Sequence, residues 1–343
     1  MELTEAELTG TNFLEVEMEN AELTPAQLAF LEASIPKFDI ADWTAKLAGQ
    51  AASARRFFRV SGAKQSYILV EWDSDDEDWP RFLGIETYLS QYVPFLPKIY
   101  ASDPIHGLIL EEDLGDVTLK RFCVEHAGNS ALIEEAYRKI INTLIVWHSQ
   151  DVANCPFILP RSMDVETFIW ETTYFSRHCV VEFFAEERLL TENWEKERRK
   201  IAVHAAGIQP AVCIHRDFQS ENILIANGGH IKFVDYQGAR LGPPHYDAAS
   251  LIFDPYVNLG KDMMERLVEY YLTKTNAAAA KNDFYICAAQ RLMQALGAYA
   301  NLSLHKDKPR YREFIPTALE RLYYVMEFLP EYPTIKEVVH GCQ

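Results

Sequence analysis

Cysteine is scarce in this chain of 343 residues, and the six cysteines lie at least 24 positions apart. They form no CxxC pair, which argues against a zinc ribbon or a disulfide scaffold and predicts free, mostly buried thiols. Long apolar runs are also missing: even the stretch CVVEFF is interrupted by Glu182, so no membrane span is expected. The acidic start MELTEAELTG has neither the basic nor the apolar region of a signal peptide, and we expect a cytoplasmic protein.

Positive charge is also in short supply, because 33 Lys and Arg face 50 Asp and Glu, a formal net charge of −17. Such a surface repels phosphate backbones, and we expect no nucleic-acid partner. The motifs GxGxxG, GxxxxGK[ST], GxSxG and HExxH are all absent, which removes the usual support for dinucleotide-binding, Walker-type, α/β-hydrolase and zincin functions. With 48% apolar and 24% charged residues, the chain has the composition of an ordinary globular protein.

The pattern of the chain changes twice along its length. Residues 1–24 are acidic and weakly patterned, and TPAQLAFLEASIP then predicts a short helix capped by Thr24. Up to residue 113, strand-like segments and a helix over RFLGIETYLSQY predict a small, mostly antiparallel sheet. After Gly115 the spacing is mostly helical, apart from short strands around the Gly228-Gly229 turn. We therefore predict an α+β chain with an acidic segment at 1–24, a β-rich lobe at 25–113 and a helical lobe at 114–343.

The segment from Cys213 to Gly238 carries the candidate chemistry. In IHRDFQSENILI, Asp217 is followed five positions later by Asn222, and a later strand-like segment presents Asp235 in VDYQG. Phosphoryl transfer needs a carboxylate that receives or orients the acceptor hydroxyl, and oxygen ligands for the Mg²⁺ that bridges the β- and γ-phosphates. The three residues have these types and this spacing, so they point to phosphoryl transfer.

These motifs resemble the aminoglycoside phosphotransferase family of the protein-kinase-like superfamily, over nearly the whole chain from about residue 25. The resemblance implies a bilobal fold and an ATP-dependent small-molecule kinase, in which Asp217 is the catalytic base and Asn222 and Asp235 bind Mg²⁺. It also implies that His215 braces the catalytic loop and that Asp247, in PHYDAAS, anchors it. The partner would be a small-molecule substrate, with no obligate protein partner.

The first lobe matches this family less closely. The segment GLILEEDLGDVTL resembles the hinge that binds adenine through backbone groups, with Glu111, Glu112 and Asp113 marking its position. The usual Gly-rich loop is reduced to Gly49 in GQAAS, and Val70 stands near the position of the usual lysine.

A neighbouring arginine could supply the missing positive charge, although these arginines could equally be exposed residues at a strand edge. Glu86 lies where the glutamate that pairs with that lysine belongs, and Arg56 is our candidate for the phosphate-binding charge. Arg55 and Arg59 stay open as alternatives, and alternation along a strand puts them on the opposite face from Arg56.

A more specific resemblance concerns the acceptor. LAGQAASARRFFRV, LILEEDLGD, VDYQGARLGPPHYDAASLIFDPY and QRLMQALGAYANL resemble bacterial kinases that phosphorylate the anomeric hydroxyl of N-acetylmuramic acid and N-acetylglucosamine in cell-wall recycling. The carboxylate of N-acetylmuramic acid would need a cation such as Arg177 or Arg291, whereas a polycationic aminoglycoside would need acids such as Glu171 and Asp254. An aminoglycoside or choline-type kinase and a catalytically inactive binding module are the alternatives.

Overall fold

The computed structural model describes residues 21–50 and 55–343. Contacts divide the described chain into two compact units. Unit 1 runs up to Phe122 and includes Glu221–Gly238, and unit 2 comprises Cys123–Ser220 and Ala239–Gln343. The segment Glu221–Gly238 thus belongs to unit 1, although the segments before and after it belong to unit 2. The composition of the chain did not indicate this division. Most of the acidic segment 1–24 and of the loop GQAAS lies outside the described residues.

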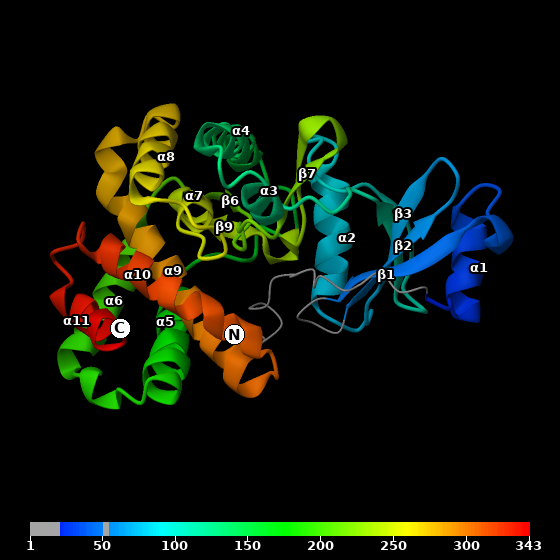
Figure 1. Cartoon of the computed structure of the whole chain (residues 1–343). Coiled ribbons are helices and arrows are strands. Elements are labelled where there is room, and N and C mark those ends of the chain that lie inside the picture. The colour runs from blue at the N-terminus through cyan, green and yellow to red at the C-terminus, as the bar shows by residue number, and fades with distance from the viewer. Residues whose placement is uncertain (1–20, 51–54) are drawn as a thin grey trace. The chain divides into compact units, whose positions relative to one another are not determined.

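A five-stranded antiparallel sheet in the order β1-β2-β3-β5-β4 forms the centre of unit 1 (Figure 1). One face packs on α1, where Phe30 and Leu31 meet Phe58, Val60 and other apolar side chains of the sheet. The elements of this unit are α1 (Pro25–Ser34), β1 (Thr44–Gln50), β2 (Arg56–Ser61), β3 (Ser66–Glu71), α2 (Asp78–Leu89), β4 (Ile99–Asp103), β5 (Leu108–Glu112), β7 (Ile223–Ala226) and β8 (His230–Phe233).

The two helices of unit 1 follow from local signals in the sequence. Pro25 begins α1 and Thr24 caps it, as the sequence predicted, and the structure adds a capping box between Thr24 and Gln27. Helix α2 lies on the side of the sheet opposite to α1 (Figure 1), and Phe82 contacts Trp72 there at 5.6 Å between ring centroids. The segment RFLGIETYLSQY, predicted to be helical, extends to Tyr92, but α2 ends at Leu89 and Tyr92 is 60% exposed.

The hairpin β7-β8 belongs to unit 1 through backbone hydrogen bonds. The amide of Phe233 donates to Phe95 at 2.8 Å, and that of Ile225 donates to Val117 at 2.8 Å. Gly228 and Gly229 make the turn with φ values of 79° and 74°, a left-handed conformation in which a side chain would be strained. The turn expected at these glycines is therefore confirmed.

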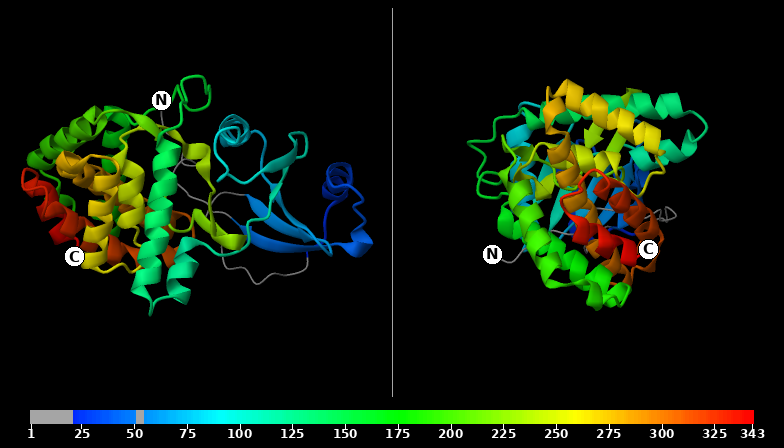
Figure 2. Two further views of the ribbon diagram at one scale, coloured as in Figure 1. Left: turned by 90° about the horizontal axis from the view of Figure 1, so that it is seen from above. Right: turned by 90° about the vertical axis from the view of Figure 1, so that its left-hand side faces the viewer.

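Unit 2 is mostly helical, and α9 lies in contact with α5, α6, α7 and α10. In both views of Figure 2, α4 runs alongside α8, and Arg266 joins them through an ion pair with Glu134 at 2.8 Å. The elements are α4 (Ser130–His148), α5 (Val165–Tyr174), η3 (Phe175–Phe183), α6 (Glu192–Gly207), β6 (Val212–Ile214), β9 (Arg240–Gly242), α7 (His245–Ile252), α8 (Lys261–Lys274), α9 (Lys281–His305), α10 (Ile315–Met326) and α11 (Pro333–Gly341).

The remaining elements are short. Helix α3 (Leu119–Glu125) carries the chain from unit 1 into unit 2. Short 3-10 helices cover Ile40–Asp42, Glu187–Leu189, Asn227–Gly229, Tyr236–Gly238, Ala278–Ala280 and Pro309–Phe314. The predicted α+β class, with an antiparallel sheet followed by a mostly helical region, is confirmed. All six cysteines are free and buried, as expected.

The segment after α5 is helical, but its hydrogen bonding is that of a π-helix. Helix η3 continues directly from α5 and packs on α9. The fit is close at Gly297 of α9, because a Cβ atom there would lie 2.8 Å from the backbone of Tyr174 and Phe175. Within the described residues, no helix is long and apolar enough to cross a membrane.

Candidate functional site

A pocket with about 380 Å³ of empty space opens on the face of the unit 1 sheet that carries α2. Most of its lining is apolar, and three ionisable side chains reach it: Arg55, Glu111 and Asp235. Val70, for which the resemblance suggested the position of a lysine, is part of the apolar lining. The other lining residues are Phe57, Trp72, Phe82, Pro97 and Val234.

Arg55 supplies the positive charge of this pocket. Its side chain is buried, its guanidinium lies 4.4 Å above the centroid of Trp72, and it pairs with Asp235 at 3.2 Å. The neighbouring Glu111 is fully enclosed, and burial raises the pKa of its carboxyl to about 8 although the charge of Arg55 lowers it. At neutral pH the pocket therefore holds one arginine and one largely protonated glutamate beside Asp235.

The structure does not place Arg56, our candidate for the phosphate-binding arginine, in this pocket. Arg56 points to the opposite face of the sheet, as alternation requires, and its half-exposed side chain pairs with Glu71 at 2.6 Å. Arg59 is bound by Asp113 and Asp116 at 2.8 and 2.6 Å. Of the three arginines, Arg55 is therefore the one that lines the pocket.

Most of the other acids assigned to the nucleotide site are engaged elsewhere in unit 1. Glu112 pairs with Lys232 at 2.8 Å, and Asp113 pairs with Arg59 and accepts the amide of Gly115 at 3.0 Å. Glu86 is buried, and burial raises the pKa of its carboxyl even though a backbone hydrogen bond opposes the shift. Only Glu111, among the three acids expected to mark the hinge, lines the pocket.

The two expected metal ligands lie at one end of the β7-β8 hairpin. Ile223 pairs with Phe233, and the amide of Val234 donates to the carbonyl of Asn222 at 3.0 Å, so Asp235 directly follows the residue that is paired with Asn222. Asp235 has a φ of 63°, a strained conformation that is frequent at functional sites. An amide oxygen and a carboxylate oxygen are the hard donors that Mg²⁺ prefers, so the donor set fits this ion.

In unit 2, Asp247 holds the loop that carries Asp217. Its carboxylate accepts the amides of His215 and Arg216 at 2.7 and 2.9 Å, and it pairs with His148 at 3.0 Å. The His215 ring is buried against Trp147 and Phe218. The expected anchoring role of Asp247 is therefore confirmed, and His215 has the packing of a bracing residue.

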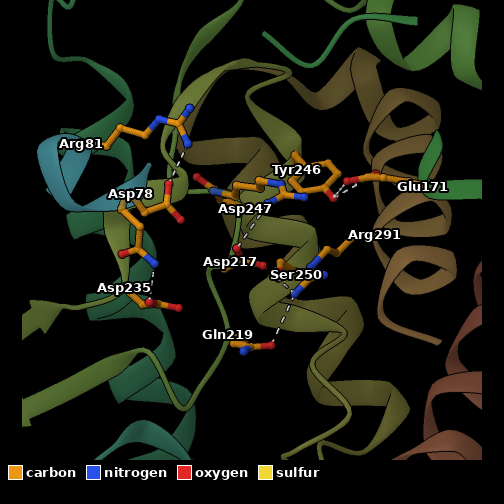
Figure 3. Close-up of polar contacts among 12 residues, drawn as sticks. Asp78, Arg81, Glu171, Asp217, Gln219, Asp235, Tyr246, Asp247, Ser250 and Arg291 are labelled. Carbon is orange, nitrogen blue, oxygen red and sulfur yellow. Dashed lines mark hydrogen bonds and ion pairs between the residues drawn. The ribbon is translucent and has the colours of Figure 1, made fainter. Parts of the chain in front are cut away.

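Asp217 lies next to a buried arginine. Arg291 of α9 approaches its carboxylate at 3.5 Å (Figure 3). Arg216 approaches it at 3.8 Å. The guanidinium of Arg291 also donates to Ser250 at 3.0 Å and to Gln219 at 3.4 Å. Arg216 has a φ of 78°, so the loop is strained on the residue preceding Asp217.

A second pocket, with about 230 Å³ of empty space, lies in unit 2 and is lined by Gln219, Ser250 and Arg291 among others. Asp254 also lines it, but its carboxylate accepts the amides of Ser220 and Tyr256 at 2.6 and 3.0 Å. The remaining lining is mainly apolar and aromatic, from Ala249, Phe253, Pro255, Leu292, Ala295 and Tyr299.

The other two expected acceptor residues do not line this pocket. Glu171 is fully buried and accepts the hydroxyl of Tyr246 at 3.0 Å (Figure 3). Burial raises the pKa of its carboxyl to about 7, against the charges of Arg216 and Arg291. Arg177 is 70% exposed and pairs with Glu182 at 3.3 Å.

Sequence reasoning missed several neighbours of the expected site residues. Gln219 and Ser250 bind Arg291, and Gln237 donates to Asp235 at 2.7 Å. Neutral polar residues of this kind belong to no motif. The only signal for them in the sequence is that they lie within three positions of Asp217, Asp247 or Asp235. Trp72 follows a strand in the sequence, and nothing local indicates that it lies under Arg55.

Comparison with known proteins identifies relatives of this chain. A family model described as "Phosphotransferase enzyme family" matches residues 44–281. The N-acetylmuramate/N-acetylglucosamine kinase of Pseudomonas aeruginosa is 27% identical over 303 residues, 84% of this chain and 85% of that protein. An ethanolamine kinase of Plasmodium vivax aligns with a TM-score of 0.58 at 14% identity, over 89% of this chain and 90% of that one. APH(2″)-IIa in a ternary complex with streptomycin and ATP aligns with a TM-score of 0.58 at 13% identity, over 88% and 99%.

Proposed function

Because the chain belongs to the phosphotransferase enzyme family, we propose that this kinase uses ATP and Mg²⁺ to phosphorylate the anomeric hydroxyl of an amino sugar, N-acetylmuramic acid or N-acetylglucosamine. The observation that carries the proposal is the chemistry around Asp217. A buried arginine stands beside it and lines a pocket, whereas the nearby acids are already bound by other groups.

On the nucleotide side, unit 1 offers an apolar pocket lined by Arg55 and Asp235. The apolar lining suits a purine base, and Arg55 suits an anionic phosphate because a guanidinium binds phosphate oxygens in a fork. Asn222 and Asp235 would hold Mg²⁺, and Arg55 would then exchange its pairing with Asp235 for a phosphate. When bound, Mg²⁺ supplies charge neutralisation on the β- and γ-phosphates.

On the acceptor side, charge favours a neutral or anionic sugar over a polycation. An aminoglycoside would need free carboxylates, but Glu171 is enclosed by Tyr246 and Asp254 accepts two backbone amides. The pocket offers instead the buried guanidinium of Arg291 and the amide of Gln219. A guanidinium is suited to the carboxylate of N-acetylmuramic acid, and amide groups are suited to sugar hydroxyls.

In the reaction, Asp217 orients the anomeric hydroxyl and accepts its proton as the oxygen attacks the γ-phosphorus. One O–P bond forms at C1 of the sugar and the bond to the β-phosphate oxygen breaks, which yields the sugar 1-phosphate and ADP. The proton held on Asp217 then passes to water. Arg291 and Arg216 lie within 4 Å of the carboxylate, so they keep its orientation through this cycle.

Product analysis tests the reaction. Purified protein with ATP and Mg²⁺ is assayed for ADP release with both amino sugars, with kanamycin-like aminoglycosides and with choline, and the product is examined by ³¹P and ¹H NMR. We expect turnover of the sugars with phosphate on C1. Turnover of an aminoglycoside or choline without turnover of either sugar would overturn the assignment of the acceptor.

A variant tests the role of Arg291 separately from its contact with Asp217. Arg291→Met should lower kcat/KM for N-acetylmuramic acid by about 10-fold more than for N-acetylglucosamine, because only the former carries a carboxylate. The ratio of the kcat/KM values for the two sugars is unaffected by any change at Asp217 that slows both reactions equally. Arg177→Met is the matched control, and its ratio should equal that of the wild type because Arg177 is 70% exposed and does not line the pocket. An unchanged ratio in Arg291→Met would remove this residue from sugar recognition.

A further inference from the structure

Two histidines and a glutamate converge in unit 2 on a single carboxylate oxygen. His178 and Glu182 lie on η3, and His305 is the last residue of α9. The Nδ1 atom of His178 lies 2.6 Å from Oε2 of Glu182, and the Nε2 atom of His305 lies 2.8 Å from the same oxygen. The three candidate ligand atoms are all within 4.8 Å of one another.

We propose that His178, Glu182 and His305 form a binding site for one Zn²⁺ ion, with the fourth coordination position open to water. Two imidazole nitrogens and one carboxylate oxygen are a known ligand set for this ion, whereas Mg²⁺ and Ca²⁺ prefer oxygen ligands alone. Glu182 and His305 are partly exposed, at 27% and 49% of their side-chain surface, so an ion and a water molecule can reach the site from solvent.

The surrounding structure fixes two of the three ligands. The His178 ring packs edge-on against Tyr174, with 4.6 Å between the ring centroids, and Tyr174 accepts a hydrogen bond from Asn301 at 2.6 Å. Arg177 binds the other carboxylate oxygen of Glu182 at 3.3 Å, which leaves Oε2 directed toward the histidines. Such outer contacts orient metal ligands in known sites. Long π-helices such as η3 are rare, and π-type turns occur frequently at functional sites.

Binding of Zn²⁺ requires a small movement of the three ligand side chains. In a tetrahedral site with bonds of about 2.05 Å, ligand atoms are about 3.3 Å apart. The two N···O distances of 2.6 and 2.8 Å would therefore lengthen as the ion replaces the two hydrogen bonds. His305 follows Arg291 by 14 residues on α9, about 21 Å along the helix axis. The ion would therefore fasten the end of α9 to η3 and would take no part in phosphoryl transfer.

Zinc binding to the full chain tests the proposal. Protein treated with EDTA and dialysed is titrated with Zn²⁺ by calorimetry, and its Tm is measured with and without the ion. We expect one site per chain and a higher Tm with Zn²⁺. His305→Gln and Glu182→Gln should each weaken binding at this site by at least about 10-fold, since each removes one ligand.

The control uses a second histidine–carboxylate pair of the same unit. His204 lies 2.8 Å from Asp283 and is 35% exposed, but the pair lacks a second histidine. His204→Gln should bind Zn²⁺ like the wild type. Anomalous diffraction at the zinc edge should place a peak among the three proposed ligands. Absence of tight binding in the wild type, equal binding by His305→Gln, or equal loss in His204→Gln would each overturn the site and leave a hydrogen-bonded triad.

Discussion

The two units each contain a buried arginine beside an aspartate, Arg55 beside Asp235 and Arg291 beside Asp217, but the surroundings of the two arginines differ. Arg55 in unit 1 stacks on Trp72 and faces two acids, Asp235 and Glu111. Arg291 in unit 2 has Asp217 at 3.5 Å and otherwise donates to the neutral side chains of Ser250 and Gln219.

The difference separates two kinds of chemistry. An arginine among acids can exchange partners when a phosphate and a divalent cation arrive together, because the phosphate takes the guanidinium and the cation takes the carboxylate. An arginine among neutral hydrogen-bonding groups can hold a carboxylate in place and still bind an uncharged or anionic sugar. The two arginines are therefore expected to respond differently to the same substitutions.

Removal of the metal-binding charge should have the largest effect. Asp235→Asn should reduce turnover to the detection limit and weaken Mg²⁺-nucleotide binding, because a hard cation loses a charged oxygen ligand. Calorimetry with Mg²⁺ and a non-hydrolysable ATP analogue measures the binding. Wild-type nucleotide affinity in this variant would show that Asp235 is not a metal ligand.

Removal of the proton acceptor in unit 2 should be selective for the chemical step. Asp217→Asn should lower kcat by about 10² to 10⁴-fold, the usual range for a lost general base, and leave nucleotide affinity largely unchanged. The same calorimetric assay, combined with steady-state kinetics, checks both quantities. If Asp217→Asn and Asp235→Asn lost nucleotide affinity equally, the division of roles between the two aspartates would be wrong.

The neighbouring arginines of β2 allow a matched comparison. Arg55→Gln should weaken nucleotide binding by about 10 to 100-fold, as expected for the loss of a charge-assisted hydrogen bond, and Arg55→Lys should restore part of it. Arg56→Gln loses only a half-exposed pair with Glu71 and should change neither the nucleotide affinity nor the free energy of unfolding by more than about 1 kcal/mol. The reverse order of effects would return the phosphate-binding role to Arg56.

The last prediction concerns the pH dependence of the free energy of unfolding. The pKa of Glu111 is about 8 in the folded chain and near 4.5 when unfolded, so the folded state binds the extra proton between these values. The contribution of Glu111 to the free energy of unfolding is therefore greatest below about pH 4.5. This contribution is lost as the pH rises toward 8. The pKa of Glu171 is about 7 in the folded chain, so its contribution to the free energy of unfolding is also lost as the pH rises, over the narrower range from about 4.5 to 7.

Urea unfolding between pH 5 and 9 measures this dependence. Glu111→Gln should flatten the decline in the free energy of unfolding, above all between pH 7 and 8, where Glu171 has already titrated. Glu112→Gln is the control, because Glu112 is an acid of the same strand paired with Lys232. An identical pH profile for the wild type and Glu111→Gln would show that Glu111 is ionised in the folded protein.

Local sequence patterns predicted secondary-structure elements better than they predicted the contacts that side chains make. The cap of α1 at Thr24 and the turn at Gly228 and Gly229 were predicted correctly, because the residues that determine them are close together in the chain. The π-helical form of η3 and the exposure of Tyr92 were not predicted. Apolar spacing indicates a helix, but it determines neither the hydrogen-bond register nor the residue at which the helix ends.

The sequence by itself determined the family resemblance, the α+β class and the residues with the chemistry of a base and of metal ligands, because these depend on residue type and spacing. Only the tertiary structure selected Arg55 over Arg56 and placed Arg291 beside Asp217. It also brought His305 to Glu182 across 123 positions of sequence. A side chain's partners depend on packing between segments that are distant in the chain, and short sequence patterns carry no information about that packing.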